Sequence, residues 1–522
     1  MKIYNRYHRA TEGRRSAHDP EVLPKRIAFL KAALLNFTFL QILFLSLFAY
    51  IFGSLYQQAG HIHNFNVLFI DYDNGQVGEA IRSAYDQFEG STFPTLIERP
   101  ASDFPNPIVD LREEVCKTRY WAALYVSSGA SDRLETALSG GNAAKSYNRS
   151  DATYLVWNEA RYSTVVDSAI SANFITLTSA AQESWINSNF TEITKLLALQ
   201  DSDAVTVLSN PWSLTSINIQ PTTQGSRLIY NTLVIILIFI QEFFYLGTIN
   251  ALYIQFTLYL NLHPRRIIVY RNIISLAYTM SGSLCVTGMI WAYRVDWHVN
   301  GNQFVLSWIS LWLFAHSNFL ALDVFSIWFP PPFVPMALIT WIVINITSIL
   351  LPFELSPGFF KWGYALPAHE VYQILLDIWS GGCNPQLRVA LPVLFSWEVF
   401  GLIVTAIGVY RRCHYAVIVE EKQHAAFKNK LNAALDFERK RNAEQKEADM
   451  QNDNVEGSPE WMTERQEEEA KEEGELEEVI RNEDNKLKVR DTRHFGPSFP
   501  LAFGGEGFNS ALKKSTTSPG NL

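Results

Sequence analysis

Residues 228–246 read LIYNTLVIILIFIQEFFYL, an apolar run interrupted by a few polar side chains. A helix of about 20 apolar residues crosses the hydrocarbon core of a bilayer, whereas apolar stretches of about 10–14 residues are typical of buried helices in soluble proteins. The run therefore predicts a transmembrane helix. Glu242 lies well inside it, at a depth where an ionisable group is costly.

Five further stretches have the same character, one before this run and four after it. They are Ala32–Phe52, Ile267–Trp291, Phe304–Trp328, Val334–Leu351 and Val389–Tyr410. We therefore expect a polytopic α-helical membrane protein with about six transmembrane helices, one followed by five. The first stretch is too long, and begins too far from residue 1, to be a cleaved signal peptide, so it is expected to remain as an anchor.

The distribution of positive charge predicts the orientation, because short cytosolic loops are enriched in Lys and Arg. Eight Lys and Arg residues lie within the first 31 residues, Arg265 and Arg266 lie in the loop after the second span, and Arg411 and Arg412 follow the sixth. Both termini are therefore expected in the cytosol. The predicted segments are a cytosolic N-terminus (1–31), the first span (32–55), an exoplasmic domain (56–227), a five-helix membrane domain (228–411) and a cytosolic, largely disordered tail (412–522).

The segment 56–227 is long enough to fold as a domain. FNVLFIDYDNG, YWAALYVSS and TYLVWNEA read as strands, and stretches with helical spacing follow them, which favours an α/β domain. Asp71 and Asp73 are interpreted as turn residues, with a calcium loop or an acid pair as the alternative. Asn148 and Asn189 begin glycosylation sequons. Cys116 and Cys383 fall on the exoplasmic side and are candidates for a disulfide, with two free thiols as the alternative.

Four ionisable residues inside the predicted spans are candidates for an intramembrane polar path. They are Glu242, His316, Asp323 and Glu398. The alternative is a structural hydrogen bond or an interfacial position, which is favoured for Asp323 and Glu398 because they lie nearer the ends of their spans. In the third span a row of hydroxyl residues at intervals of four suggests close helix packing, with a polar path as the alternative. The row is Ser275, Thr279, Ser283 and Thr287.

Several classes of function lack support in the sequence. The formal net charge is −9, concentrated in the run Glu464–Glu483, and does not suggest a nucleic-acid partner. No P-loop, HExxH or GxSxG motif occurs, so we expect neither an enzyme nor a bound cofactor or metal. Four cysteines are too few for a disulfide scaffold.

The order of elements resembles that of the membrane subunits of type-2 ABC exporters, above all the bacterial phage-infection-protein type. The matching motifs are VLFIDYDNG just after the first span and YLVWNEA further on. With the HPRR loop and ALPAHEVYQILLDIWSGG, the chain is similar to the fungal nitrosoguanidine-resistance protein family, whose membrane domain has no known function. The resemblance covers about residues 25–415 and implies a protein linked to resistance to toxic compounds.

Two functions are therefore expected as alternatives. One is a transporter-like protein that exports amphipathic compounds or redistributes lipids, without an ATPase of its own. The other is a non-transporting scaffold or regulator of other transporters or of lipid asymmetry. The expected partners are the lipid bilayer, a separate ATPase subunit or other membrane proteins, and further copies of the chain. The expected location is the plasma membrane, with an internal membrane as the alternative.

Overall fold

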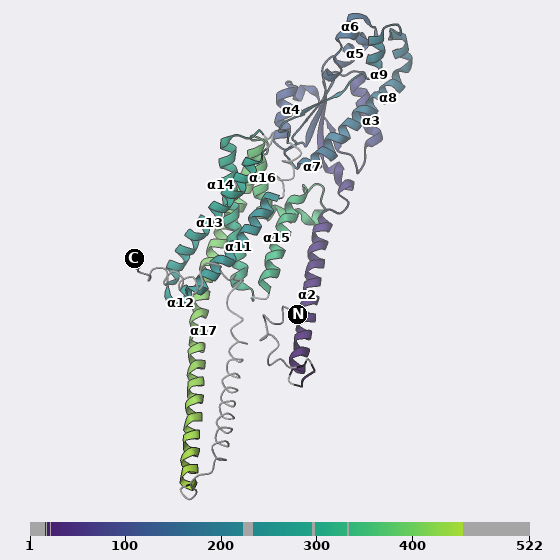
Figure 1. Cartoon of the computed structure of the whole chain (residues 1–522). Helices are drawn as coiled ribbons and strands as arrows, with labels where there is room; N and C mark the ends of the chain where they lie inside the picture. The colour runs from purple at the N-terminus through teal and green to yellow at the C-terminus, as the bar shows by residue number, and fades with distance from the viewer. Residues whose placement is uncertain are drawn as a thin grey trace, which may run out of the picture.

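The computed structural model describes residues 16, 18–20, 22–222, 233–294, 298–330 and 333–452. Several expectations fall outside these residues: the first 15 residues, the start of the second span, part of the FPPPF turn, and the acidic run with the rest of the tail. Within the described residues the chain forms an α/β domain and a group of long apolar helices, as Figure 1 shows.

Five described helices are long and apolar enough to cross a membrane, and α15 (Val334–Leu350) is apolar but has only 17 residues. The five are α2 (Leu23–Ser54), α11 (Val234–Gln255), α13 (Pro264–Ala292), α14 (Gly301–Trp328) and α17 (Leu387–Asn452). The protein is thus a membrane protein with several apolar helices. We call α11 and α13–α17 the helix bundle.

Helix α14 lies at the centre of the bundle and packs against α11, α13, α15, α16 and α17. Its contact with α17 is close because α17 presents glycines there: a methyl group at Gly401 would lie 2.6 Å from Cβ of Leu320. The short helix α12 (Leu258–Asn261) joins α11 to α13. Buried side chains from all these helices form the membrane part of the hydrophobic core.

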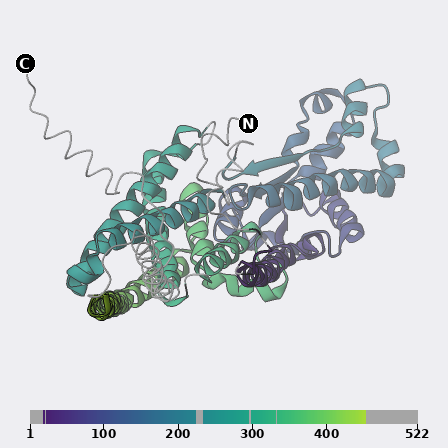
Figure 2. The same ribbon diagram turned by 60° about the horizontal axis from the view of Figure 1, so that its bottom comes forward.

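Helix α2 and the second half of α17 have little to pack against. Helix α2 lies beside α15 at the edge of the helix bundle (Figures 1 and 2). Most of its apolar side chains are exposed, as expected of a helix surrounded by lipid. Helix α17 has 66 residues, which at about 1.5 Å per residue is far longer than the bilayer core of about 30 Å. Its second half projects beyond the bundle (Figure 1). Within the tail, the Lys, Arg, Glu and Ala content of residues 413–450 predicts that they continue the sixth span as a charged helix, with disorder beyond them. The structure confirms this helix, because α17 is helical as far as Asn452.

Helix α16 (Pro367–Trp379) lies in the connection between α15 and α17, after the 3₁₀ helix Gly358–Ala365. From its sequence it is expected to lie either on the membrane surface or partly inside the bundle. The structure buries most of its side chains against α14, α15 and α17. The side chain of Asn345 accepts a hydrogen bond from the backbone N–H of Ala368, so α15 caps the start of α16.

The α/β domain is built on a five-stranded mixed sheet in the order β2-β1-β3-β4-β5. The strands are β1 (Asn66–Asp71), β2 (Thr95–Glu98), β3 (Ala122–Val126), β4 (Thr153–Trp157) and β5 (Leu214–Asn218). Only the β3–β4 pair is antiparallel; Ala122 pairs with Trp157 and Val126 with Thr153. The other neighbours are parallel, with Val67 opposite both Leu96 and Ala122.

Helices cover both faces of this sheet because alternate residues of a strand point to opposite sides. Val67 and Phe69 face one core, and Leu68 and Ile70 face the other together with Leu111 of α4 (Pro107–Cys116). The first core is covered by α3 (Gln76–Phe88), α5 (Ala130–Leu138) and α8 (Ala172–Leu196). Smaller helices complete the domain: α6 (Gly141–Ser146), α7 (Ser163–Val166), the π-helix Asp167–Ser171, α9 (Ser202–Ser209) and the 3₁₀ helices Gln58–Asn64, Ala101–Asp103 and Arg149–Asp151.

The DYDNG segment after β1 forms a turn. Oδ1 of Asp71 accepts hydrogen bonds from the backbone N–H groups of Asp73 and Asn74, each at 3.0 Å. Its Oδ2 lies 2.8 Å from Nη2 of Arg82, and Asp73 accepts from the backbone and hydroxyl of Ser131. Both carboxylates thus have protein partners, and the described residues contain no cluster of acidic, His and Cys side chains that would hold a metal.

Candidate functional site

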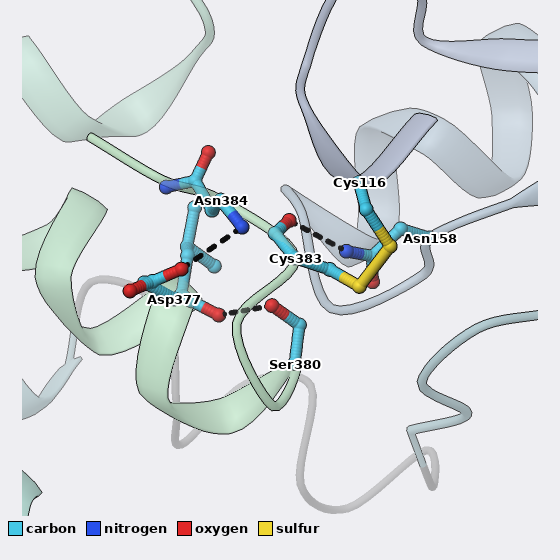
Figure 3. The surroundings of a disulfide bond; sticks show 7 residues. Cys116, Asn158, Asp377, Ser380, Cys383 and Asn384 are labelled. Atoms are coloured by element: carbon cyan, nitrogen blue, oxygen red, sulfur yellow. Dashed lines mark hydrogen bonds between the residues drawn. A yellow bond between two sulfur atoms is a disulfide. The ribbon is translucent and has the colours of Figure 1, made fainter. Parts of the chain in front are cut away.

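The α/β domain meets the helix bundle at a joint formed by the loop after β4 and the loop after α16. Cys116 at the end of α4 forms a disulfide with Cys383 in the loop after α16, as Figure 3 shows. Nδ2 of Asn158 lies 3.5 Å from the carbonyl oxygen of Cys383, and Glu159 accepts a 2.6 Å hydrogen bond from Asn218. The YLVWNEA motif therefore contributes its Asn to the joint, while its Glu is bound to β5 within the α/β domain.

The next two residues of the same loop complete the joint. The guanidinium of Arg161 lies 3.6 Å from the centre of the Trp121 ring, and its Nη1 has no hydrogen-bond partner among the described residues. Burial lowers the pKa of Arg161, and the carboxylate of Glu354 opposes this shift. The ring of Tyr162 packs against that of Tyr372 in α16, with 5.1 Å between the ring centres. Burial raises the pKa of Tyr162 well above its usual value. This part of the joint thus consists of buried aromatic rings and the guanidinium of Arg161, which stacks on one of them.

A cavity of about 440 Å³ lies beside this joint. Its wall combines polar side chains between the start of α7 and α8, such as Thr164 and Asn173, with leucines at and just after the end of α15. These leucines are Leu350, Leu351 and Leu355. The π-helix Asp167–Ser171 forms part of the wall, and π-helical turns often occur at functional sites. A space of this size, polar on one side and apolar on the other, suits an amphipathic molecule.

Inside the bundle, Asp323 is clamped between two arginines. Nη2 of Arg271 lies 2.7 Å from Oδ1 of Asp323, and its Nε donates to Oδ2 at 3.1 Å. Nη2 of Arg412 lies 3.0 Å from Oδ1. The cluster joins α13, α14 and α17, and its three charged side chains are each at most 5% exposed.

Neutral groups complete this cluster. Asn250 accepts a 2.9 Å hydrogen bond from Arg271, and Ser326 accepts a 2.7 Å bond from Arg412. The hydroxyl of Tyr259 in α12 accepts from Arg412 at 3.2 Å. The cluster holds two positive charges and one negative charge, so its formal net charge is +1. We call Arg271, Asp323 and Arg412 the arginine clamp.

About two turns away, His316 and Glu398 form a second polar group. Nδ1 of His316 lies 2.6 Å from Oε1 of Glu398, whose Oε2 accepts from Ser317 at 2.9 Å. On the other side of the ring, Nε2 lies 3.0 Å from the hydroxyl oxygen of Ser275. The structure therefore brings together two of the residues expected in a polar path, from α14 and α17, and adds a serine from α13.

The hydroxyl oxygen of Ser275 also lies 3.0 Å from the carbonyl oxygen of Asn272. The order hydroxyl, imidazole, carboxylate is also that of a nucleophilic triad. However, Ser275 lies in the middle of α13, where the backbone N–H groups are used by the helix and cannot stabilise an oxyanion. The arrangement suits proton transfer better than acyl transfer.

Glu242 differs from the other three predicted residues. It is completely buried in α11, and neither carboxylate oxygen has a hydrogen-bond partner among the described residues. Oε1 of the neighbouring Gln241 is also unpaired. Buried polar atoms are nearly always hydrogen-bonded, and an exception calls for an explanation. Glu242 therefore does not join the two polar clusters.

The row of hydroxyl residues in α13 serves close packing. Thr279 and Thr287 donate to carbonyl oxygens four residues earlier in the same helix, at 2.9 and 2.8 Å. Trp308 and Trp312 of α14 donate from their indole N–H groups to backbone carbonyls of α13. The row is buried between α13 and its neighbours, and only Ser275 contacts another of the predicted polar residues.

The two glycosylation sequons lie on the α/β domain. The side chain of Asn148 is exposed and accepts a hydrogen bond from the backbone of Ser150, at the start of a 3₁₀ turn. Asn189 lies within α8, where its amide donates to the carbonyl oxygen of Trp185. Neither residue contacts the polar clusters in the bundle.

The main residues missed from the sequence are Arg271 and Arg412. Arg271 lies inside a predicted span, four residues after its first residue, and Asp323 lies five residues before the end of the next. Because successive spans run in opposite directions, these positions fall at the same depth. The equal depth of Arg271 and Asp323 is the signal in the sequence that predicts their ion pair.

Comparison with known proteins agrees with a membrane protein but assigns no activity. The chain is similar to an uncharacterized endoplasmic reticulum membrane protein of Saccharomyces cerevisiae, with 21% identity over 389 residues, 66% of this chain and 73% of the relative. No solved structure matches. A family model described as "Protein of unknown function (DUF3533)" matches residues 36–403. The chain that carries this clamp and this joint therefore belongs to the DUF3533 family of proteins of unknown function.

Proposed function

We propose that the chain crosses the membrane six times, with both termini in the cytosol and the α/β domain on the exoplasmic side. The basic residues before α2, between α12 and α13 and after the apolar part of α17 support this orientation. The disulfide supports it independently, because both cysteines would lie in an oxidising compartment. The plasma membrane is the proposed location, and the yeast relative makes the endoplasmic reticulum the alternative.

Asn148 tests this orientation. We expect the native protein to carry a glycan there, so that its mobility on a gel increases after glycosidase treatment. Both Asn148→Gln and Ser150→Ala destroy the sequon, and both should remove the same mobility change. A native protein that is insensitive to glycosidase, and whose α/β domain is digested only after the membrane is opened, would place the domain in the cytosol.

We propose further that the protein moves amphipathic compounds or lipids across or within the bilayer, without an ATPase of its own. Glu242 carries this proposal. An unpaired carboxylate inside a membrane bundle costs several kcal/mol, so this group is expected to take up a proton or a cation. Such an exchangeable charge is a common feature of transport paths. The amphipathic cavity at the joint adds a space for the compound.

The substitution Glu242→Gln separates transport from folding. Gln keeps the shape of the side chain and removes the ionisable group, so we expect the variant to reach the membrane with unchanged or higher thermal stability. We expect its activity to be lost, both in cell resistance to nitrosoguanidine and in movement of labelled lipids after reconstitution into liposomes. The matched control is Glu183→Gln, which neutralises an exposed carboxylate of α8. Full activity of Glu242→Gln would contradict the proposal.

The projecting half of α17 favours a second candidate, a scaffold or regulator of other membrane proteins. This segment extends beyond the bundle (Figure 1). Most of its described side chains are exposed. A chain truncated after residue 430 retains the whole bundle and discriminates between the two functions. Loss of resistance with unchanged lipid movement in liposomes would favour the scaffold. The transporter is favoured if Glu242→Gln loses both resistance and lipid movement while the truncated chain keeps both.

A further inference from the structure

The cavity at the joint lies where α2 and α15 end beneath the α/β domain. One wall is formed by Leu350 and Leu351 at the end of α15 and by Leu355 beyond it. The other walls come from the 3₁₀ helix Gln58–Asn64, which follows α2, and from the segment 164–173 of the α/β domain. Figure 1 shows α7 above the neighbouring ends of α2 and α15. A molecule in the cavity therefore contacts the bundle and the α/β domain together.

Aromatic side chains mark the level of this cavity in the membrane. Tyr50, near the end of α2, packs against Phe360 and Trp362, with 5.0 and 6.2 Å between the ring centres. Tyr and Trp are enriched at the boundary between lipid and water. Gln58 and Ala59 follow Tyr50 along the chain, line the cavity and are exposed. The cavity therefore opens near the headgroup level, where a molecule dissolved in the bilayer can reach it.

No charged side chain lines the cavity among the residues that the structure describes. The polar part of its wall consists of amide and hydroxyl groups, which belong to Gln58, Thr164, Ser168 and Asn173. Glu354 adjoins the lining residue Leu355 in the sequence, but it interacts with Arg161 and does not line the cavity. Burial of an ion without a counter-charge is costly. The wall therefore favours an uncharged ligand over a phosphate or an ammonium group.

The polar groups of the wall can accept hydrogen bonds from a ligand. The hydroxyl of Ser168 donates to the carbonyl oxygen of Thr164 at 3.1 Å, and the amide of Asn173 donates to that of Ala169 at 2.8 Å. Oγ of Ser168 and Oδ1 of Asn173 thus remain as acceptors. The side chains of Gln58 and Thr164 form no hydrogen bond to another described residue. A ligand hydroxyl that donates to this wall finds several oxygen atoms in place.

We propose that the cavity binds an uncharged lipid alcohol, with its hydroxyl group against Thr164 and Asn173 and its apolar body against the three leucines. Sterols and diacylglycerols share this chemistry. The volume of about 440 Å³ falls within the range of about 300–1,000 Å³ that is usual for small-molecule sites. The inference rests on the transport function proposed above, because it names the class of compound that the cavity receives.

The test compares each alcohol with its acetate ester, which has the same body but no hydroxyl proton. The purified full chain is placed in phosphatidylcholine nanodiscs that contain ergosterol, dioleoylglycerol or one of their acetates, and bound lipid is measured by mass spectrometry. We expect at least one alcohol to be retained roughly threefold to tenfold more than its ester, the effect of one hydrogen bond. The alcohol that shows this preference identifies the source of the ligand.

Two substitutions at exposed positions locate the binding in the cavity. Thr164→Val removes a hydroxyl group and keeps the shape of the side chain, so it should reduce the preference for the alcohol. Its matched control is Thr176→Val, at an exposed threonine of α8 that does not line the cavity. Ala59→Trp fills the space and should abolish binding of alcohol and ester alike, whereas Ala59→Ser should retain both.

The outcomes separate this inference from the transport proposal. Equal retention of alcohol and ester by the native protein would overturn the inference, as would native binding in both Thr164→Val and Ala59→Trp. Stronger retention of phosphatidylserine than of either alcohol would also overturn it. Glu242→Gln should bind the alcohol like the native protein, since Glu242 does not line the cavity. Full transport by that variant would contradict the transport proposal and leave the binding result standing.

Discussion

Replacing Asp323 by asparagine should lower the free energy of unfolding of the bundle by about 3–5 kcal/mol, because it removes one partner of a buried ion cluster. Asp323 is the only acid bound to Arg271 and Arg412 among the described residues. Asn keeps the shape of the side chain, so the loss comes from two buried guanidinium groups left without a counter-charge. Unfolding of the purified protein in detergent, monitored by circular dichroism against a denaturant series, measures the change.

Two substitutions control for this effect. Asp436→Asn removes the acid of an exposed pair with Arg439 and should change the stability by less than about 1 kcal/mol. Ser326→Ala removes a neutral partner of the clamp and should cost roughly 0.5–1.5 kcal/mol. If Asp323→Asn were no more destabilising than Asp436→Asn, the clamp would not hold the three helices together.

A triple substitution separates charge balance from packing. Changing Arg271 and Arg412 to Met and Asp323 to Leu removes all three charges while it fills a similar volume. Replacement of a whole buried ion cluster by apolar residues is often neutral or stabilising. We therefore expect the triple variant to recover most of the stability lost in Asp323→Asn, as the same denaturant series would measure.

The sequence predicts the depth of the buried polar residues but not their partners, and the bundle gives an example. Hydropathy predicts where a helix enters the bilayer, so the spans and the depth of Asp323 and His316 follow from the sequence. Hydropathy does not say which helices are neighbours. His316 and Glu398 are 82 residues apart, and their contact depends on the packing of α14 against α17. The sequence therefore predicts buried candidates, whereas their partners require the fold.

The α/β domain gives a similar result. The three strands with long β-branched and aromatic runs, β1, β3 and β4, are where the sequence predicts them. Strands β2 and β5 are not predicted, because TLIE is short and LTSIN is mostly polar. Both are edge strands that gain their stability from pairing with β1 and β4. Local sequence carries little signal for a strand of that kind.

The substitution Cys116→Ser should destabilise the contact between the α/β domain and the bundle by about 2–5 kcal/mol. The disulfide closes a loop of 267 residues, so its loss frees the two parts to separate when the chain unfolds. The remaining contacts at the joint include one long hydrogen bond, from Asn158 to Cys383, and the rings around Arg161. Thermal unfolding and the rate of proteolysis in the loop after α16 measure the change.

The redox state of Cys116 and Cys383 also decides the orientation. Native protein treated with reductant should acquire the stability of Cys116→Ser, and a membrane-impermeant thiol reagent should label both cysteines on intact cells only after reduction. Cys285→Ser, at a free cysteine of α13, should leave stability and labelling of these two positions unchanged. Free thiols in the native protein would contradict both the disulfide and the exoplasmic domain, because a cytosolic pair would stay reduced. The disulfide between the end of α4 and the loop after α16 thus links the fold directly to the side of the membrane on which the domain lies.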